Sequence, residues 1–111
     1  MKWYYNLFLG EKITPKYKQT VLKIKNREFT PNVYLITLAS NPKNLLDILS
    51  AEELIQNRYP KTEIFVIGLA QGKKEAFEVT RQIVDEVYQK TGNTNVREYL
   101  TQSTAETVLW L

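Results

Sequence analysis

EIFVIGLAQGKKEAFEVTRQIVDEVYQKTG, residues 63–92, reads as a buried strand, a glycine-containing turn and a long amphipathic helix in direct succession. Residues 64–70 are apolar without polar alternation, which is typical of a strand covered on both faces. Gly92 supplies the left-handed residue that ends the helix. From Lys73 the apolar residues recur every three or four positions, and we expect the face that they form to be buried: Ala76, Phe77, Thr80, Ile83, Val84, Val87 and Tyr88.

Two more strands are predicted on the N-terminal side of this unit. Residues 3–9 and residues 33–39 are both rich in aromatic and aliphatic side chains. Residues 33–39 also align with residues 64–70 at an offset of 31 residues, and a helical pattern follows each of them. Two consecutive strand–turn–helix units favour a parallel sheet with right-handed crossovers.

The segment between the first two strands has two interpretations. Thr14 followed by Pro15 is a typical helix start and predicts a helix over residues 15–27. However, Leu22 and Ile24 also alternate with lysines as in a strand, which would make the domain α+β. We favour the helix because two parallel neighbouring strands need a crossover of about a dozen residues between them.

The segment after residue 39 is predicted to be helical as well. Ser40 precedes Pro42 by two positions, which indicates a helix that continues to about residue 57. Ser50 and Glu53 have the capping-box spacing, so this helix is expected to break near Ser50 and start again.

The C-terminal part of the chain combines a short helix with an apolar end. Asn95 and Glu98 have the capping spacing and predict a helix start. Residues 107–111 are mostly apolar, so we expect them to form an edge strand, a plug on the core or part of a subunit contact. The predicted fold class is α/β: a single domain over residues 1–111, of small three-layer βαβαβα type, with a mainly parallel sheet of three strands and a fourth edge strand from the C-terminus.

Composition excludes several classes of chemistry. The chain contains no Cys and no His among its 111 residues, so it has no disulfide, no thiolate nucleophile and no imidazole for a metal or a proton. No apolar run approaches the roughly 20 residues that span a bilayer, and the N-terminus does not read as a signal peptide. We therefore expect a cytoplasmic protein without a membrane partner.

The net charge of +3 is unevenly distributed along the sequence. Residues 1–30 hold seven Lys or Arg against two Glu, whereas residues 63–111 hold five against seven. The excess is carried by Lys12, Lys16, Lys18, Lys23, Lys25 and Arg27. The simplest interpretation is a solvated helix surface. Weak nucleic-acid binding through this basic segment, with Tyr17 and Phe29 nearby, is a second alternative, but no nucleic-acid-binding module can be read and nucleic acid is not an expected partner.

The turn GLAQGKK, residues 68–74, superficially resembles a phosphate loop but does not match one. A P-loop has four residues between its glycines and a hydroxyl residue after the lysine, whereas here three residues separate Gly68 from Gly72 and Lys74 follows Lys73. The three-glycine dinucleotide fingerprint is absent too. We therefore predict no cofactor, and assign Gly68 to close packing and Gly72 to a tight turn.

A broader hypothesis concerns the edge at which parallel strands end. All strand-to-helix turns of a parallel sheet meet at that edge, where helix N-termini and ammonium groups together favour an anion. The predicted ligand-binding residues are Lys12, Thr14, Ser40, Asn41, Lys43, Gln71, Gly72 and Lys73.

The sequence does not indicate a catalyst. Its carboxylate pairs, such as Glu52 with Glu53 and Asp85 with Glu86, are adjacent in sequence and do not converge on one point. We expect a non-catalytic binding or accessory module that self-associates, with a homodimer as the leading expectation. The alternative is a binder of a phosphate- or carboxylate-bearing small molecule at the carboxyl edge of the sheet.

Overall fold

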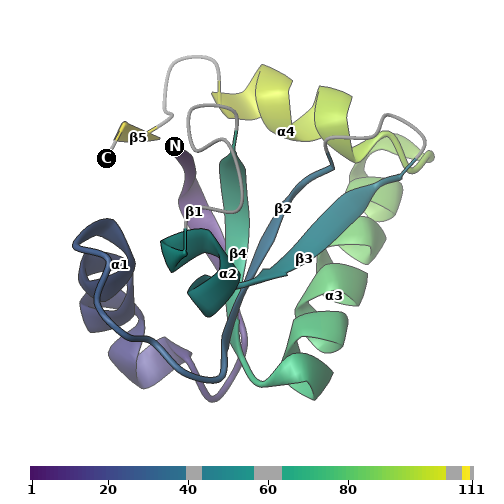
Figure 1. Cartoon of the computed structure of the whole chain (residues 1–111). Coiled ribbons are helices and arrows are strands. Elements are labelled where there is room, and N and C mark those ends of the chain that lie inside the picture. Colours follow the sequence, from purple (N-terminus) through teal and green to yellow (C-terminus); the bar gives the residue numbers. More distant parts are fainter. Residues whose placement is uncertain (40–43, 57–63, 105–108, 111) are drawn as a thin grey trace.

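The computed structural model describes residues 1–39, 44–56, 64–104 and 109–110, and these form a mixed α/β fold (Figure 1). The strands lie in the order β3-β2-β4-β1-β5. Their bounds are Lys2–Leu9 (β1), Val33–Leu38 (β2), Leu46–Ser50 (β3), Phe65–Gln71 (β4) and Leu109–Trp110 (β5). The helices are α1 (Tyr17–Lys25), α2 (Ala51–Ile55), α3 (Lys73–Thr91) and α4 (Val96–Thr104), and a 3-10 turn, η1 (Thr14–Lys16), precedes α1.

The sheet is not mainly parallel, which corrects the prediction. β1 pairs with β4 in parallel, but β2 is antiparallel to both β3 and β4. The two strands that suggested a repeat are therefore antiparallel neighbours, with Tyr34 opposite Ala70 and Leu35 opposite Leu69. The prediction failed because an apolar strand reports that both of its faces are covered, and this is equally compatible with either direction of pairing.

The second predicted helix is wrong over most of its length. Leu46–Ser50 forms strand β3, which pairs with β2 from Leu38 opposite Leu46 to Tyr34 opposite Ser50. The helix restarts where it was expected, because the Ser50 side chain accepts a hydrogen bond from the Glu53 N–H at 3.1 Å and caps α2. The predicted break is thus a junction between a strand and a short helix, and the expected βαβαβα order does not hold.

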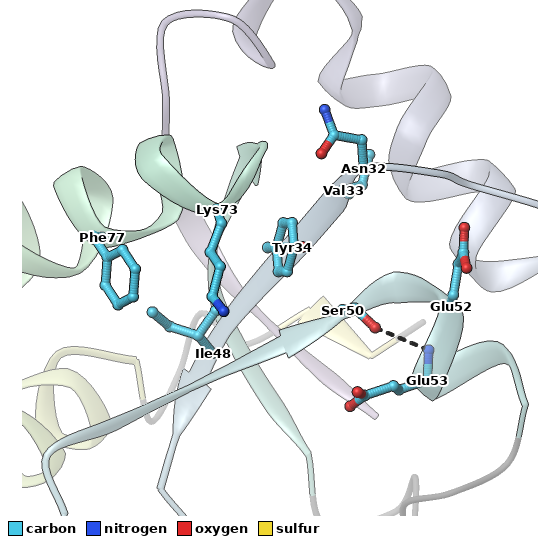
Figure 2. A pocket seen from close by; sticks show the side chains of 9 residues that line it. All are labelled: Asn32, Val33, Tyr34, Ile48, Ser50, Glu52, Glu53, Lys73 and Phe77. Carbon is cyan, nitrogen blue, oxygen red and sulfur yellow. Dashed lines mark hydrogen bonds between the residues drawn. The ribbon is translucent and has the colours of Figure 1, made fainter.

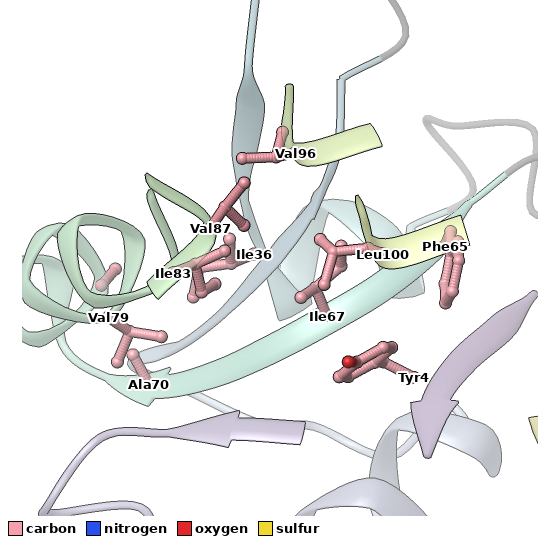
Figure 3. Packing of buried hydrophobic residues seen from close by; sticks show 11 residues of the cluster. Tyr4, Ile36, Phe65, Ile67, Ala70, Val79, Ile83, Val87, Val96 and Leu100 are labelled. Atoms are coloured by element: carbon pink, nitrogen blue, oxygen red, sulfur yellow. The ribbon is translucent and has the colours of Figure 1, made fainter. Parts of the chain in front are cut away.

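The apolar side chains form two clusters, one on each face of the sheet. α3 and α4 cover one face, where Val79, Ile83, Val87 and Leu100 are fully buried (Figure 3). α1 and α2 contribute Ile24, Ala51 and Leu54 to the cluster on the other face (Figure 1). Each large aliphatic side chain buried in these clusters contributes roughly 1.5–3 kcal/mol. The apolar runs in β2 and β4 are therefore explained by helices on both faces.

Helix α3 forms as predicted, but its buried face is rotated from the expected one. Ala76, Val79, Ile83 and Val87 point into the core, whereas Phe77 is 58% exposed and Tyr88 is 57% exposed. Since both aromatic residues lie one position beyond a buried residue, they occupy the flank of the helix rather than its inner face. The helix ends at Gly92 with φ of 76°, as expected for a left-handed cap.

Four other local predictions are confirmed. The first strand is present as β1, and the ambiguous basic segment folds as the helix α1. The Asn95 and Glu98 side chains cap α4, because Asn95 Oδ1 accepts from the Glu98 N–H at 3.1 Å and Asn95 Nδ2 donates to Glu98 Oε2 at 2.9 Å. The C-terminal segment supplies the two-residue edge strand β5, antiparallel to the start of β1. None of the helices described is long and apolar enough to cross a membrane.

Gly68 is required by the close approach of β1 and α3 to β4. A Cβ at this position would lie 2.8 Å from the Phe8 carbonyl oxygen and 3.1 Å from Val79 Cγ1. Gly68→Ala should therefore lower the free energy of unfolding by about 1–3 kcal/mol, measured by urea denaturation. Gly92→Asn is the control, because nothing lies within 4 Å of a Cβ there and Asn tolerates the left-handed region. Equal stability of the two variants would contradict this assignment.

Candidate functional site at the carboxyl edge of the sheet

Three strands of the same direction end at one edge of the sheet. Since β3 and β4 are both antiparallel to β2, and β1 is parallel to β4, Leu9, Ser50 and Gln71 lie at the same end of their strands. β2 runs the other way and ends with Leu38 at the opposite edge. An edge built from three strand ends therefore exists, but its third member is β3 rather than β2.

The predicted site residues are only partly brought together. Five of them lie at this edge, because Lys12 and Thr14 follow β1, whereas Gln71 ends β4 and Gly72 and Lys73 follow it. The remaining predicted residues, Ser40, Asn41 and Lys43, lie outside the residues that the structure describes. Because β2 ends at the opposite edge, the argument that placed those three beside the others no longer applies.

A carboxylate of the protein itself occupies the backbone donors of this edge. Glu75, in the first turn of α3, is only 7% exposed. Its Oε1 accepts a hydrogen bond from the Lys12 N–H and its Oε2 accepts one from the Gln71 N–H, both at 2.7 Å. Hydrogen bonds to a charged group typically stabilise a protein by about 1.5–3 kcal/mol each. Glu75 thus fastens the turn after β1 to the turn after β4, in the place expected for an external anion.

Gly10 makes room for this carboxylate. A Cβ on Gly10 would lie 2.1 Å from Glu75 Cδ, so no side chain fits while Glu75 keeps both hydrogen bonds. The Gly10 carbonyl also accepts from the Thr14 hydroxyl at 2.7 Å, and the Gly10 N–H donates to the Leu69 carbonyl at 3.1 Å. The predicted ligand residue Thr14 is therefore engaged in holding its own turn.

A groove of about 520 Å³ opens at the same edge of the sheet, between the start of α3 and the hairpin of β2 and β3 (Figure 2). In the view of Figure 2 the Lys73 side chain extends from the start of α3 towards Ile48, with Phe77 on one side and Tyr34 on the other. The groove is lined by Asn32, Val33, Tyr34, Ile48, Ser50, Glu52, Glu53, Lys73 and Phe77. Its wall is held in place by the Gly72 N–H, which donates to the Asn32 carbonyl at 2.8 Å.

Of the groove residues, Lys73 alone was among the predicted ligands. Phe77 was expected in the core, and its position next to Ala76 on the helix gave the signal that it could lie on the flank instead. Tyr34 and Ile48 became neighbours through the β2–β3 hairpin, which the sequence did not predict. Glu75 was also missed, although it lies four residues before Val79 and hence on the buried face.

The groove has the chemistry of a binding surface with two kinds of contact. Val33, Tyr34, Ile48 and Phe77 supply aromatic and aliphatic contacts, whereas Lys73, Glu52 and Glu53 supply one ammonium group and two carboxylates. The Ser50 hydroxyl serves as the cap of α2. Among the described residues no group of three or more Asp or Glu side chains is placed to hold a metal ion.

Comparison with known proteins adds no relative. Neither a protein-family model, nor a curated protein, nor a solved structure matches the chain. The function must therefore be argued from the geometry of the chain itself.

The Gly10–Glu75 contact predicts a coupled pair of substitutions. Glu75→Ala removes the acceptor of the partly buried Lys12 and Gln71 N–H groups and should lower the free energy of unfolding by about 2–4 kcal/mol. Gly10→Ala should lower the free energy of unfolding of the natural chain by about 1–3 kcal/mol, because the added methyl group displaces the Glu75 carboxylate. The same substitution should have a much smaller effect in the Glu75→Ala variant. A double-mutant cycle by urea denaturation should thus give a coupling above about 1 kcal/mol.

The control is Glu78→Ala, which removes an exposed carboxylate from the same helix and should change stability by less than about 0.5 kcal/mol. Additive effects of Gly10→Ala and Glu75→Ala would show that the two positions act independently and would refute this account of the edge.

Proposed function

We propose that this chain is a non-catalytic binding module that self-associates as a homodimer through the outer edge of β3 and the adjacent flank of α3. The observation that carries the proposal is the exposure of Phe77 and Tyr88 on the flank of α3 beside an edge strand. We keep the cytoplasmic location as part of the same proposal.

The two edges of the sheet differ in their readiness to accept a strand. In the described part of the chain no strand lies beyond β3, and its five residues pair with β2 without a register shift. On the other side, β5 pairs with Lys2 and Trp3 at the start of β1. β1 also carries a large bulge, because Trp3 lies opposite Val66 but Phe8 opposite Gly68. Bulges protect edges from further pairing, so β3 is the better edge for a second copy.

The flank of α3 is self-complementary in an antiparallel arrangement. Phe77, Arg81, Val84 and Tyr88 follow one another at intervals of four, three and four residues and so share a stripe. A twofold axis near the middle of this stripe brings Phe77 of one copy towards Tyr88 of the other, and Arg81 towards the oppositely charged Asp85. A twofold interface uses the same patch on both subunits, as this arrangement does.

Phe77→Lys should convert the homodimer into a monomer, because it places an ammonium group in the aromatic contact between Phe77 of one copy and Tyr88 of the other. Light scattering coupled to size-exclusion chromatography should give twice the monomer mass of 13.0 kDa for the natural chain and the monomer mass for the variant. Phe29→Lys is the matched control, since Phe29 is 73% exposed and lies outside β3 and α3.

The proposal would be refuted if the natural chain stayed monomeric up to about millimolar concentration. Loss of the dimer in both variants would instead show that added charge, rather than the position of Phe77, disrupts the assembly.

The alternative function is the binding of a phosphate- or carboxylate-bearing small molecule at the edge near Lys12 and Lys73. Because Glu75 already accepts from the backbone N–H groups there, we expect a few millimolar phosphate to leave the melting temperature of the natural chain unchanged. Under the alternative, a ligand at 100 times its dissociation constant would add about 2.7 kcal/mol of stability. A clear rise in melting temperature would therefore favour the anion-binding function.

A further inference from the structure

A second groove, of about 450 Å³, lies between the bulged part of β1 and helix α1. In the strand order of the sheet, β1 is separated from β3 by β2 and β4. Aromatic and aliphatic side chains dominate its lining: Trp3, Tyr4, Tyr5, Asn6, Leu7, Leu9, Tyr17, Lys18, Val21 and Leu22. Tyr5 is 49% exposed and Leu22 is 56% exposed, so part of this lining faces solvent. The lining includes no acidic residue.

The groove is bordered by the most basic part of the chain. Residues 12–27 contain six Lys or Arg and no Asp or Glu. Lys18 lines the groove, and Lys25 lies on the same helical stripe, because Lys18, Leu22 and Lys25 are separated by four and three residues. Lys18 therefore lies at a groove that is lined by tyrosine rings, and Lys25 continues the same stripe further along α1.

We propose that this groove binds single-stranded nucleic acid, with bases stacked on Tyr5 and Tyr17 and phosphates contacted by Lys18 and Lys25. Base–aromatic stacking combined with a cationic track is the usual way in which proteins hold single strands without sequence preference. The structure adds what the sequence lacked, since β1 and α1 bring Tyr5 into the same groove as Tyr17 and Lys18. This surface is separate from the β3–α3 surface of the proposed dimer.

Single-stranded nucleic acid is a better candidate ligand for the groove than a peptide that adds a β-strand. A peptide that adds a strand needs a regular hydrogen-bonding edge, whereas four residues of β1 bulge between Trp3 and Phe8 opposite one residue of β4. Single-stranded nucleic acid binds through stacking on aromatic side chains and through contacts between phosphates and ammonium groups, so it does not require a regular edge of the protein backbone.

The test is fluorescence anisotropy of the full chain with labelled 12-nucleotide oligo-dT and oligo-U, over a salt series that starts near 50 mM. Affinity should fall steeply with salt. Lys18→Glu with Lys25→Glu should weaken binding about ten-fold or more at low salt. The same variant should reduce the slope of log affinity against log salt by roughly 1.4, at about 0.7 for each phosphate that is no longer neutralised. Circular dichroism checks that each variant is folded.

The matched control is Lys23→Glu with Lys90→Glu, which changes the net charge equally at exposed positions away from the groove and away from the stripe of Phe77. It should retain most of the affinity. An equal reduction of affinity in both double variants would mean that net charge alone attracts the oligonucleotide, and the groove assignment would fall.

Substitution of Tyr5 separates stacking from charge. Tyr5→Ala should weaken binding about ten-fold, because one stacked base loses its ring, whereas Tyr5→Phe should bind like the natural chain. The absence of binding at any salt concentration overturns the proposal. It is also overturned if Tyr5→Ala has no effect, if a duplex of the same length binds as tightly, or if poly-glutamate displaces the oligonucleotide at equal charge concentration.

Discussion

The antiparallel pairing of β2 with β4 is the constraint on which both the architecture and the candidate surfaces depend. β2 lies between β3 and β4 and is antiparallel to each of them, so β1, β3 and β4 share one direction. Their carboxyl ends therefore gather at one edge, where the turn after β1 meets the start of α3. The same pairing places β3 at the end of the sheet, next to the flank of α3, and so creates the groove that contains Lys73 and Phe77.

The sequence could predict those parts of the fold that local pattern determines. The strand over residues 64–70, helix α3 and its cap at Gly92 follow from periodicity and from the conformation that glycine allows. The direction of β2 could not be predicted in this way, because hydrophobicity shows that a strand is covered and not how it runs. The stretch Leu46–Ser50 is compatible with either helical or strand periodicity, and only its pairing with β2 decides between them.

The position of the candidate site could be predicted from the sequence, but most of the residues that form it could not. General rules of sheet topology state that the carboxyl ends of parallel strands meet at one edge. This rule identified Lys12 and Lys73. The decisive residue, Glu75, was hidden because an acidic residue in the first turn of a helix is normally explained by the helix dipole. Its role depends on Gly10, which is 65 residues earlier in the sequence and meets it only through the pairing of β1 with β4.

The distribution of charge argues that the two proposed surfaces have different partners. At the carboxyl edge Glu75 already supplies the negative charge that the backbone N–H groups favour, so we expect external anions to gain little there. The stripe on α3 includes Arg81 and is flanked by Asp85, so this surface carries both signs and can meet its own copy without net repulsion. Helix α1 carries three lysines and no acidic residue, so two copies that met through it would oppose like charges across the contact, which costs several kcal/mol in an interface. A polyanion is thus the better partner for α1, and a second copy of the chain is the better partner for α3.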